Sequence, residues 1–339
     1  MSTIDIFKNK VRLATEEDYK NFEKFSYSRL STFLHCPMQY KLKYIDGHYT
    51  SDTTLALELG SLCHKVLEDK GNMIINCEEV DKSKLKSIID NGANPEPDDT
   101  KTTEHLLGVP ALAKKYFMEW NKPDNASGMS YPEKMNIFQK VLESEMMNTE
   151  WKPKWCEHPF GFVWNERAIL SGFIDRVDVR KTLQGEEFRT IDYKTSKKIF
   201  AKSELPTSLQ FGIYALAIYS ETGQLPVESL YRFILIDDQQ NALTKGWEKR
   251  LDKKLDKIFD SIDELKKTSV YKPNPTPLCH WCAYCKTNHD AHEFKNLCEY
   301  HSLWTPENKT FDKAKPWDDL FSFEQPTKLN VGTKRKLVF

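Results

Sequence analysis

Two short stretches of the chain place carboxylates and a lysine where they could serve a metal ion. They read Gly172-Phe-Ile-Asp175-Arg-Val-Asp178 and Thr190-Ile-Asp192-Tyr-Lys194-Thr-Ser. If the two stretches are strands of a hairpin, the midpoint between Asp175 and Asp192 falls within the turn-like sequence Thr182-Leu-Gln-Gly185. A symmetric hairpin therefore places Asp175 opposite or near Asp192.

Two carboxylates at that spacing repel each other, because like charges across a strand pair are destabilising. A divalent cation between them turns the repulsion into a binding site, and hard oxygen ligands suit Mg²⁺ or Mn²⁺. Strand side chains alternate, so Lys194 lies on the same face as Asp192. An ammonium group there can orient a water nucleophile or stabilise charge developing on a phosphoryl group. The ordinary alternative is an ion pair at an exposed strand edge.

Two pairs of residues at helical spacing extend this pattern. His64 and Glu68 are four positions apart on an expected helix and share a face, and both side-chain types bind metals. Gln210 and Tyr214 share a face of a later expected helix in the same way. Three lysines precede that helix: Lys197, Lys198 and Lys202. Amide, phenol and ammonium groups near a metal suit a phosphodiester backbone, whereas either pair alone could be a solvated helix face.

The cysteines are unevenly distributed. Four of the eight fall within twenty residues: Cys279, Cys282, Cys285 and Cys298. Cys36 stands far upstream, directly before a proline. The N-terminus has no visible export signal, and in such a chain crowded cysteines favour a metal or cluster site over disulfides.

The composition excludes several classes of protein. With 49 Lys+Arg and 50 Asp+Glu among 339 residues the net charge is −1, which excludes a polybasic protein that coats nucleic acid by bulk charge. Hydrophobic residues make up 39% and aromatic residues 12%, too much for a disordered chain. No apolar run approaches the roughly 18 residues that a membrane span requires. We therefore expect a soluble cytoplasmic protein without a membrane partner.

Hydrophobic periodicity predicts the elements that position these residues. Helices are expected near 56–70, 111–120, 133–147, 207–221 and 247–268, and strands near 160–169, 171–180, 187–194 and 229–236. A further helix is expected to begin at Ser28 or Ser31 as its cap. The polar residues 71–103 are expected to form a surface insertion.

Five motifs in order resemble the RecB-like branch of the PD-(D/E)XK nuclease superfamily. They are the two stretches above and the segments Ser28-Arg-Leu-Ser-Thr-Phe-Leu-His-Cys36-Pro-Met-Gln-Tyr40, Gly60-Ser-Leu-Cys-His64-Lys-Val-Leu-Glu68 and Gln210-Phe-Gly-Ile-Tyr214. The resemblance implies an α/β fold of restriction-endonuclease type, with a mixed central sheet flanked by helices, helical additions and a C-terminal cysteine cluster. It suggests an N-terminal arm (1–24), a nuclease domain (25–302, including the cysteine-cluster region 279–298) and a C-terminal tail (303–339).

The resemblance also implies roles for individual residues. His64, Asp175, Asp192 and the backbone carbonyl of Tyr193 would bind the metal, and Lys194 would activate the attacking water. Gln210 and Tyr214, with Lys197 and Lys198 before them, would contact DNA. Glu68 matches a glutamate of the first motif that is counted among the catalytic residues. Asp192 stands where many relatives have Glu, which shortens the reach toward the metal.

A subset of this branch carries a four-cysteine [4Fe–4S] cluster with one ligand upstream and three near the C-terminus. Cys36 fits the upstream position, and Cys279 and Cys282 resemble the next two. Asn288 occupies the place of the usual last cysteine, so Cys298 or, as an alternative, Cys285 would complete the set. Zinc bound by the same thiolates and unliganded reduced cysteines are the other interpretations.

The leading hypothesis is a Mg²⁺- or Mn²⁺-dependent DNA nuclease, an exonuclease of the single-domain type that bacteriophages encode, in DNA processing, recombination or phage replication. It would act in the cytoplasm of a bacterial host. The alternatives are a DNA-binding accessory subunit of a helicase or recombination complex and a binding module with a decayed site. The segments Lys315-Pro-Trp-Asp-Asp-Leu-Phe321 and Lys334-Arg-Lys336 could dock on a helicase, polymerase or recombination protein, or pack on their own domain.

Overall fold

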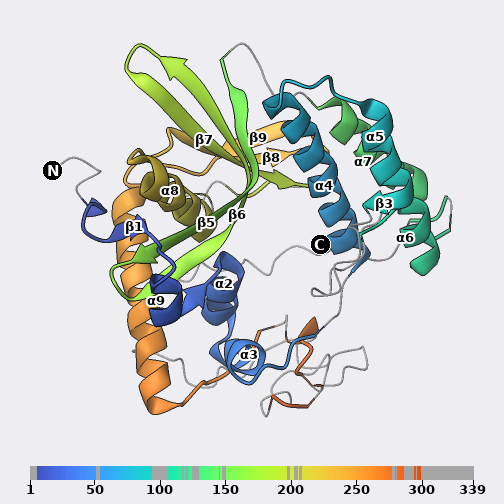
Figure 1. Cartoon of the computed structure of the whole chain (residues 1–339). Coiled ribbons are helices and arrows are strands. Elements are labelled where there is room, and N and C mark those ends of the chain that lie inside the picture. Colours follow the sequence, from blue (N-terminus) through green and yellow to red (C-terminus); the bar gives the residue numbers. More distant parts are fainter. Residues whose placement is uncertain are drawn as a thin grey trace. The chain divides into compact units, whose positions relative to one another are not determined.

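A computed structural model describes most of the first 298 residues (Figure 1). The described residues are 6–50, 54–93, 106–116, 118–119, 121–123, 130–144, 146, 150–196, 199–201, 205, 208–276, 279, 281–285, 294 and 296–298. The chain divides into two compact units. Unit 1 contains the described residues of Met1–Lys24 and Thr53–Leu251, and unit 2 contains those of Phe25–Asp52 and Asp252–Lys336.

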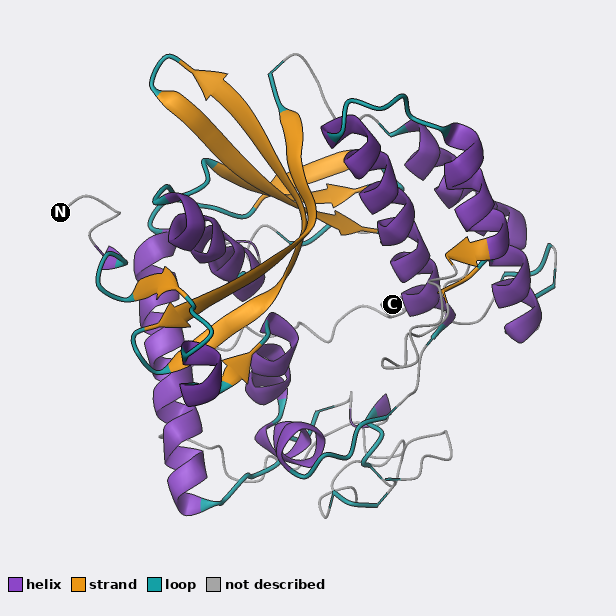
Figure 2. Cartoon of the chain, in the orientation of Figure 1, coloured by secondary structure: helices purple, strands orange, loops and turns teal. Residues whose placement is uncertain are grey.

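A mixed sheet forms the centre of unit 1, with strand order β1-β5-β6-β7-β8-β9 (Figure 2). These strands are β1 (Val11–Leu13), β5 (Lys152–Trp164), β6 (Ala168–Thr182), β7 (Gly185–Lys194), β8 (Glu228–Phe233) and β9 (Asp238–Asn241). β7 and β8 run parallel, and the other neighbours along this path run antiparallel. Two shorter strands, β3 (Gly92–Ala93) and β4 (Leu106–Leu107), pair separately. The mixed sheet agrees with the predicted fold class.

The predicted hairpin of β6 and β7 is confirmed, including its register. Thr182 pairs with Gly185 at the turn, and Arg176 pairs with Ile191 at the far end of the paired region. Gly185 has φ +124°, a conformation that glycine adopts without the strain that a side chain would cause. The paired region thus ends directly before Asp175 on one strand and Asp192 on the other.

Helices cover both faces of this sheet. α4 (Leu55–Ile75), α5 (Lys82–Asn91), α6 (Val109–Lys115) and α7 (Tyr131–Glu143) share a hydrophobic core with Ile191 and Tyr193 of β7. Asp192 lies between those two residues and contacts Gln210 on the other face. Gln210 belongs to α8 (Leu209–Thr222), which is labelled in Figure 1. α1 (Asp18–Asn21) follows β1.

Unit 2 is helical. It contains α2 (Tyr27–His35), α3 (Pro37–Tyr40), the π-helix η2 (Lys41–Ile45) and most of α9 (Trp247–Thr268); β2 (Lys24–Phe25) stands where the chain enters it. The Phe25 and Phe259 rings meet edge to face at 5.3 Å, and the Arg29 guanidinium lies 4.5 Å from the Phe25 ring centre. Among the helices of the described residues, none is long and apolar enough to cross a membrane.

Three expectations about local structure were wrong. The expected strand 160–169 is interrupted by a tight turn, because Asn165 and Glu166 adopt left-handed conformations with φ of 49° and 47°. The described part of the expected polar insertion contains the end of α4 and all of α5, which buries Leu85, Ile88 and Ile89. The cap of α2 is Ser26 and not Ser28 or Ser31, since the Ser26 hydroxyl accepts a hydrogen bond from the Arg29 N–H.

Candidate functional site

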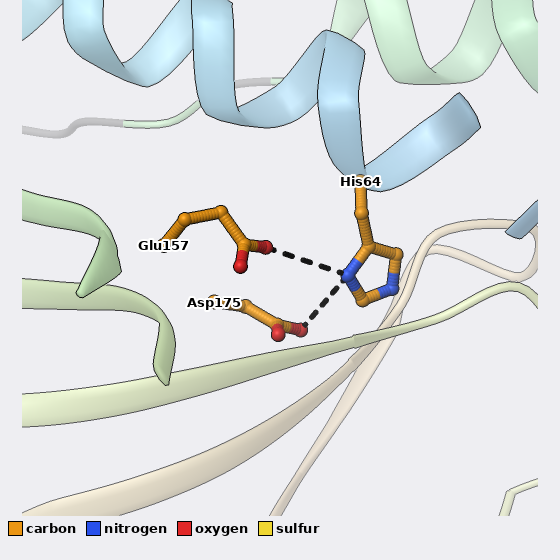
Figure 3. A group of neighbouring side chains, drawn as sticks. All are labelled: His64, Glu157 and Asp175. Carbon is orange, nitrogen blue, oxygen red and sulfur yellow. Dashed lines mark ion pairs between the residues drawn. The ribbon is translucent and has the colours of Figure 1, made fainter. Parts of the chain in front are cut away.

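His64, Glu157 and Asp175 converge from three different elements of unit 1 (Figure 3). His64 projects from α4, Glu157 from β5 and Asp175 from β6. His64 Nδ1 lies 3.4 Å from Asp175 Oδ2 and 3.9 Å from Glu157 Oε1. The potential ligand atoms of all three residues lie within 4.8 Å of one another. One imidazole and two carboxylates at this spacing can bind a divalent cation.

The backbone holds both carboxylates of this group in place. The Tyr193 N–H donates a hydrogen bond to Asp175 Oδ2 at 2.8 Å, which fixes one Asp175 oxygen where the β6–β7 ladder ends. Glu157 has φ +44° within β5, a left-handed conformation that costs a residue with a side chain about 1 kcal/mol or more. Such strain is typical of residues whose side chains are held for a function.

A second carboxylate centre lies next to this group. Asp192 is 2% exposed, and its Oδ2 lies 2.6 Å from Lys194 Nζ. Lys194 is thus the ion-pair partner of the buried Asp192 Oδ2. Burial, and then the nearby Asp175, raise the pKa of Asp192 to about 6. A buried acidic oxygen of this kind fits a site for a cation.

The Gln210 side chain connects this centre to α8. Its Nε2 donates to Asp192 Oδ1 at 2.8 Å and to the Tyr214 hydroxyl at 3.0 Å. Burial, followed by the charges of Asp192 and Asp175, raises the pKa of Tyr214 well above its usual range, so the phenol stays neutral. Both α8 residues are therefore held against Asp192.

The charge balance of the site also fits a cation. Burial of the His64 imidazole opposes its protonation, but the neighbouring Asp175 and Glu157 carboxylates outweigh burial and raise the pKa of His64 to about 10. The imidazolium thus supplies the positive charge that neighbouring carboxylates require. A divalent cation could replace that proton, because neutral imidazole is the form that binds metals.

The structure places most of the predicted site residues in this region. It brings together His64, Asp175, Asp192, Lys194, Gln210 and Tyr214. The Tyr193 ring is buried, and its hydroxyl accepts a hydrogen bond from Arg176 Nη1 at 2.9 Å. Glu68 lies outside the His64 group and pairs with Lys65 Nζ at 3.1 Å. Lys197, Lys198 and Lys202 lie outside the described residues.

Glu157 was not predicted from the sequence, although a signal for it was present. The midpoint between Glu157 and Asp175 falls at Glu166, inside the turn that joins β5 to β6. The pairs Cys156–Arg176 and His158–Ile174 flank the two acidic residues in the observed register. The symmetry argument that related Asp175 to Asp192 would therefore also have related Asp175 to Glu157.

Unit 2 contains a separate cavity of about 160 Å³ that all five predicted cysteines line: Cys36, Cys279, Cys282, Cys285 and Cys298. The backbone N–H groups of Asn274 and Thr276 donate to the sulfurs of Cys36 and Cys279 at 3.4 and 3.3 Å. Backbone N–H donors around thiolate sulfurs are typical of iron–sulfur and zinc sites.

Successive turns present three of these thiols to the cavity. The Cys282 N–H donates to the Cys279 carbonyl at 3.1 Å, and the Cys285 N–H donates to the Cys282 carbonyl at 3.0 Å. Burial and, to a smaller extent, the neighbouring Cys279, Cys36 and Cys285 raise the pKa of Cys282 to about 12. Cys285 is buried, whereas Cys298 is partly exposed. Thiols gathered in one cavity can bind a cationic centre, which takes the place of their protons.

Comparisons with known proteins identify a family for most of the chain. A sequence profile described as the PD-(D/E)XK nuclease superfamily matches residues 24–287. The chain is also similar to an ATP-dependent helicase/deoxyribonuclease subunit of Clostridium tetani (strain Massachusetts / E88), with 26% identity over 204 residues. This match covers 55% of the chain and 16% of the relative, so the chain spans less than a fifth of that protein's length.

Proposed function

The chain belongs to the PD-(D/E)XK nuclease superfamily, and we propose that it is a nuclease that hydrolyses DNA phosphodiester bonds with Mg²⁺ or Mn²⁺. The observation that carries the proposal is the convergence of His64, Glu157 and Asp175 beside the buried Asp192 and its neighbour Lys194. Decay of the site would be expected to remove at least one of these groups. Their joint presence therefore favours catalysis over DNA binding alone.

In this proposal His64, Asp175 and Asp192 bind the cation, together with the Tyr193 carbonyl, and Glu157 adds a fourth side chain. The bound metal would lower the pKa of a water molecule and neutralise phosphate charge. Lys194 orients the attacking water and stabilises negative charge on the phosphoryl oxygens. Gln210 keeps Asp192 in position through its 2.8 Å hydrogen bond, and Tyr214 supports Gln210.

We assign the chain to the RecB-like branch and to an exonuclease activity in DNA processing. The similarity to a helicase/deoxyribonuclease subunit supports the branch. That relative also supports a second candidate, an accessory subunit that acts with a helicase. A cleavage assay on linear and circular DNA separates the two, because an exonuclease degrades the linear form without a partner. Glu68 keeps a supporting role in this proposal through its ion pair with Lys65.

For the cysteine cavity we propose a [4Fe–4S] cluster bound by Cys36, Cys279, Cys282 and Cys285, with zinc as the alternative metal. The burial of Cys285 favours it over the partly exposed Cys298, the ligand expected from the sequence. The cluster would join the segment after α2 to a segment more than two hundred residues later, and such cross-links stabilise folds.

Purification without oxygen, followed by analysis of iron, sulfide and zinc, tests this assignment. We expect Cys285→Ser to lose most of the bound metal and Cys298→Ser to keep it. The reverse pattern would assign Cys298 as the fourth ligand. Wild-type protein that contains neither metal would contradict both forms of the proposal.

A further inference from the structure

Around the pair Pro159–Phe173, one face of β5–β6 packs against α8 and the other face is open to solvent. Phe160 lies on the core face, where its ring is 6.0 Å from the Tyr214 ring of α8. Gly172, directly opposite Phe160, also belongs to that face, because a Cβ there would lie 3.2 Å from the Phe160 ring. Side chains alternate along a strand, so Ser171 and Phe173 lie on the opposite face of β6.

An unexpected group on that solvent face is the Phe173 ring. The ring is 60% exposed, and Pro159, which pairs with Phe173, is exposed as well. The solvent face of an antiparallel sheet is normally polar, so a phenylalanine there is not explained by packing. Asp175 of the candidate metal site follows two residues later, about 7 Å along the strand.

A second aromatic ring, that of Tyr19, lies on the same face, at the next residue pair whose side chains point to that face. Tyr19 is 43% exposed, and its hydroxyl would lie 1.9 Å from a Cβ at Gly161. Gly161 pairs with Ser171, so Tyr19 and Phe173 lie on the same face, on neighbouring pairs along it. Lys24 places its ammonium group 5.9 Å from the Tyr19 ring centre.

We infer that Phe173 and Tyr19 form a stacking surface for the bases of a single DNA strand that leads to the metal site. The inference rests on the proposed nuclease function and specifies its substrate as an unpaired strand. Bases of a single strand can stack on aromatic side chains, whereas bases inside a duplex cannot reach them. Lys24 supplies positive charge for the phosphates, and the adjacent Asp175 gives the surface continuity with the site.

Binding measurements on the full-length protein test the surface without relying on cleavage. The probe is a fluorescent dodecathymidylate, titrated with Ca²⁺ in place of Mg²⁺ and followed by anisotropy. We expect Phe173→Ala to weaken binding about tenfold, which corresponds to the loss of one base stacked on an aromatic ring. Phe173→Trp should restore most of the affinity. Leu183→Ala is the control, since Leu183 is a fully exposed apolar residue in the turn between β6 and β7.

Two further probes separate stacking from other causes. With an oligomer of abasic nucleotides, wild type and Phe173→Ala should bind alike, because the bases that would stack on the ring are missing. With a blunt duplex of the same length, the two proteins should again differ less than twofold. The inference would be overturned if Phe173→Ala lost affinity equally for all three probes, or lost none for dodecathymidylate. No affinity of the wild type for dodecathymidylate would also overturn it.

The same experiment distinguishes this inference from the proposed function. If wild type binds the oligomer through Phe173 but cleaves no DNA with Mg²⁺ or Mn²⁺, the nuclease proposal fails and the stacking surface stands. If wild type cleaves DNA and Phe173→Ala binds and cleaves like wild type, the nuclease proposal stands and the stacking surface is wrong.

Discussion

Asp175 Oδ2 accepts a hydrogen bond of 2.8 Å from the backbone N–H of Tyr193, on the neighbouring strand. The bond lies where the β6–β7 ladder ends, after the pair Arg176–Ile191. It holds one carboxylate oxygen beside His64, and it gives a partner to an N–H group at the point where the strands stop pairing. A single side chain thus serves both the fold and the proposed metal site.

Substitution of Asp175 should separate these two roles. Asp175→Asn keeps an oxygen that can accept from Tyr193, whereas Asp175→Ala leaves that N–H without its partner. Both variants remove the same charge, so we expect Ala to unfold with about 1–3 kcal/mol less free energy than Asn. Both should lose the rise in melting temperature that Mn²⁺ gives the wild type. Urea unfolding measures the first effect, and an Ala variant as stable as Asn would contradict the hydrogen-bond role.

Glu157 should contribute to metal affinity. Glu157→Gln removes one charged ligand from the group, and we expect Mn²⁺ binding to weaken at least about tenfold. Glu186→Gln is the matched control, because Glu186 is a strand residue that pairs with Lys154 and its substitution removes the same charge. Isothermal titration calorimetry with Mn²⁺ gives both affinities. Equal affinities of Glu157→Gln and the control would exclude Glu157 as a ligand.

The buried Asp192 predicts a specific pH dependence for the metal-free protein. Burial and Asp175 raise its pKa to about 6, above the value of an unfolded chain, so its protonation stabilises the fold at low pH. That contribution is lost as the pH rises through about 6. Asp192→Asn should therefore raise the free energy of unfolding, relative to wild type, by about 1 kcal/mol more at pH 8 than at pH 5.

Chemical unfolding in the presence of EDTA measures this difference, and Asp263→Asn on α9 serves as a control for the loss of one carboxylate. If Asp192→Asn raises the unfolding free energy by the same amount at both pH values, Asp192 titrates as it does in an unfolded chain.

Lys70 should stabilise the packing of α4 against the end of α7. It is 6% exposed, and its ammonium group donates to the carbonyls of Leu142 and Ser144, both at 2.6 Å, at the end of α7. Lys70→Met leaves those carbonyls without this donor, so we expect a loss of about 1–3 kcal/mol in unfolding free energy. Lys86→Met, at an exposed α5 position, should change stability by less than about 0.5 kcal/mol. Similar losses for the two variants would contradict this role.

The sequence identified the β6–β7 hairpin because its turn residues and its apolar alternation agree. The same approach missed the β5–β6 turn, since Asn165, Glu166 and Arg167 contain neither glycine nor proline and lie within an otherwise strand-like run. The expected strand began at residue 160, so Glu157 was left outside it, whereas β5 begins at Lys152. Glu157 adopts a left-handed conformation, which sequence patterns do not report.

α5 was missed for a different reason. Its apolar residues are three, Leu85, Ile88 and Ile89, in a segment dominated by lysine and serine. Their burial depends on α4, α6 and α7, which are distant in sequence, so local composition favoured a polar loop. By contrast, His64 and Glu68 share a helix face as expected, yet His64 lies beside Asp175 and Glu157 whereas Glu68 pairs with Lys65.

The most direct test of the account is a cleavage time course with wild type and Lys194→Ala on linear double-stranded, circular double-stranded and circular single-stranded DNA. Lys194 is chosen because it contacts the buried Asp192 yet lies outside the group formed by His64, Glu157 and Asp175. The account predicts that wild type degrades linear DNA only with Mg²⁺ or Mn²⁺, and that Lys194→Ala binds DNA within a few-fold of wild type without cleaving it. Cleavage by Lys194→Ala at the wild-type rate, or no cleavage of any substrate by metal-loaded wild type, would contradict it.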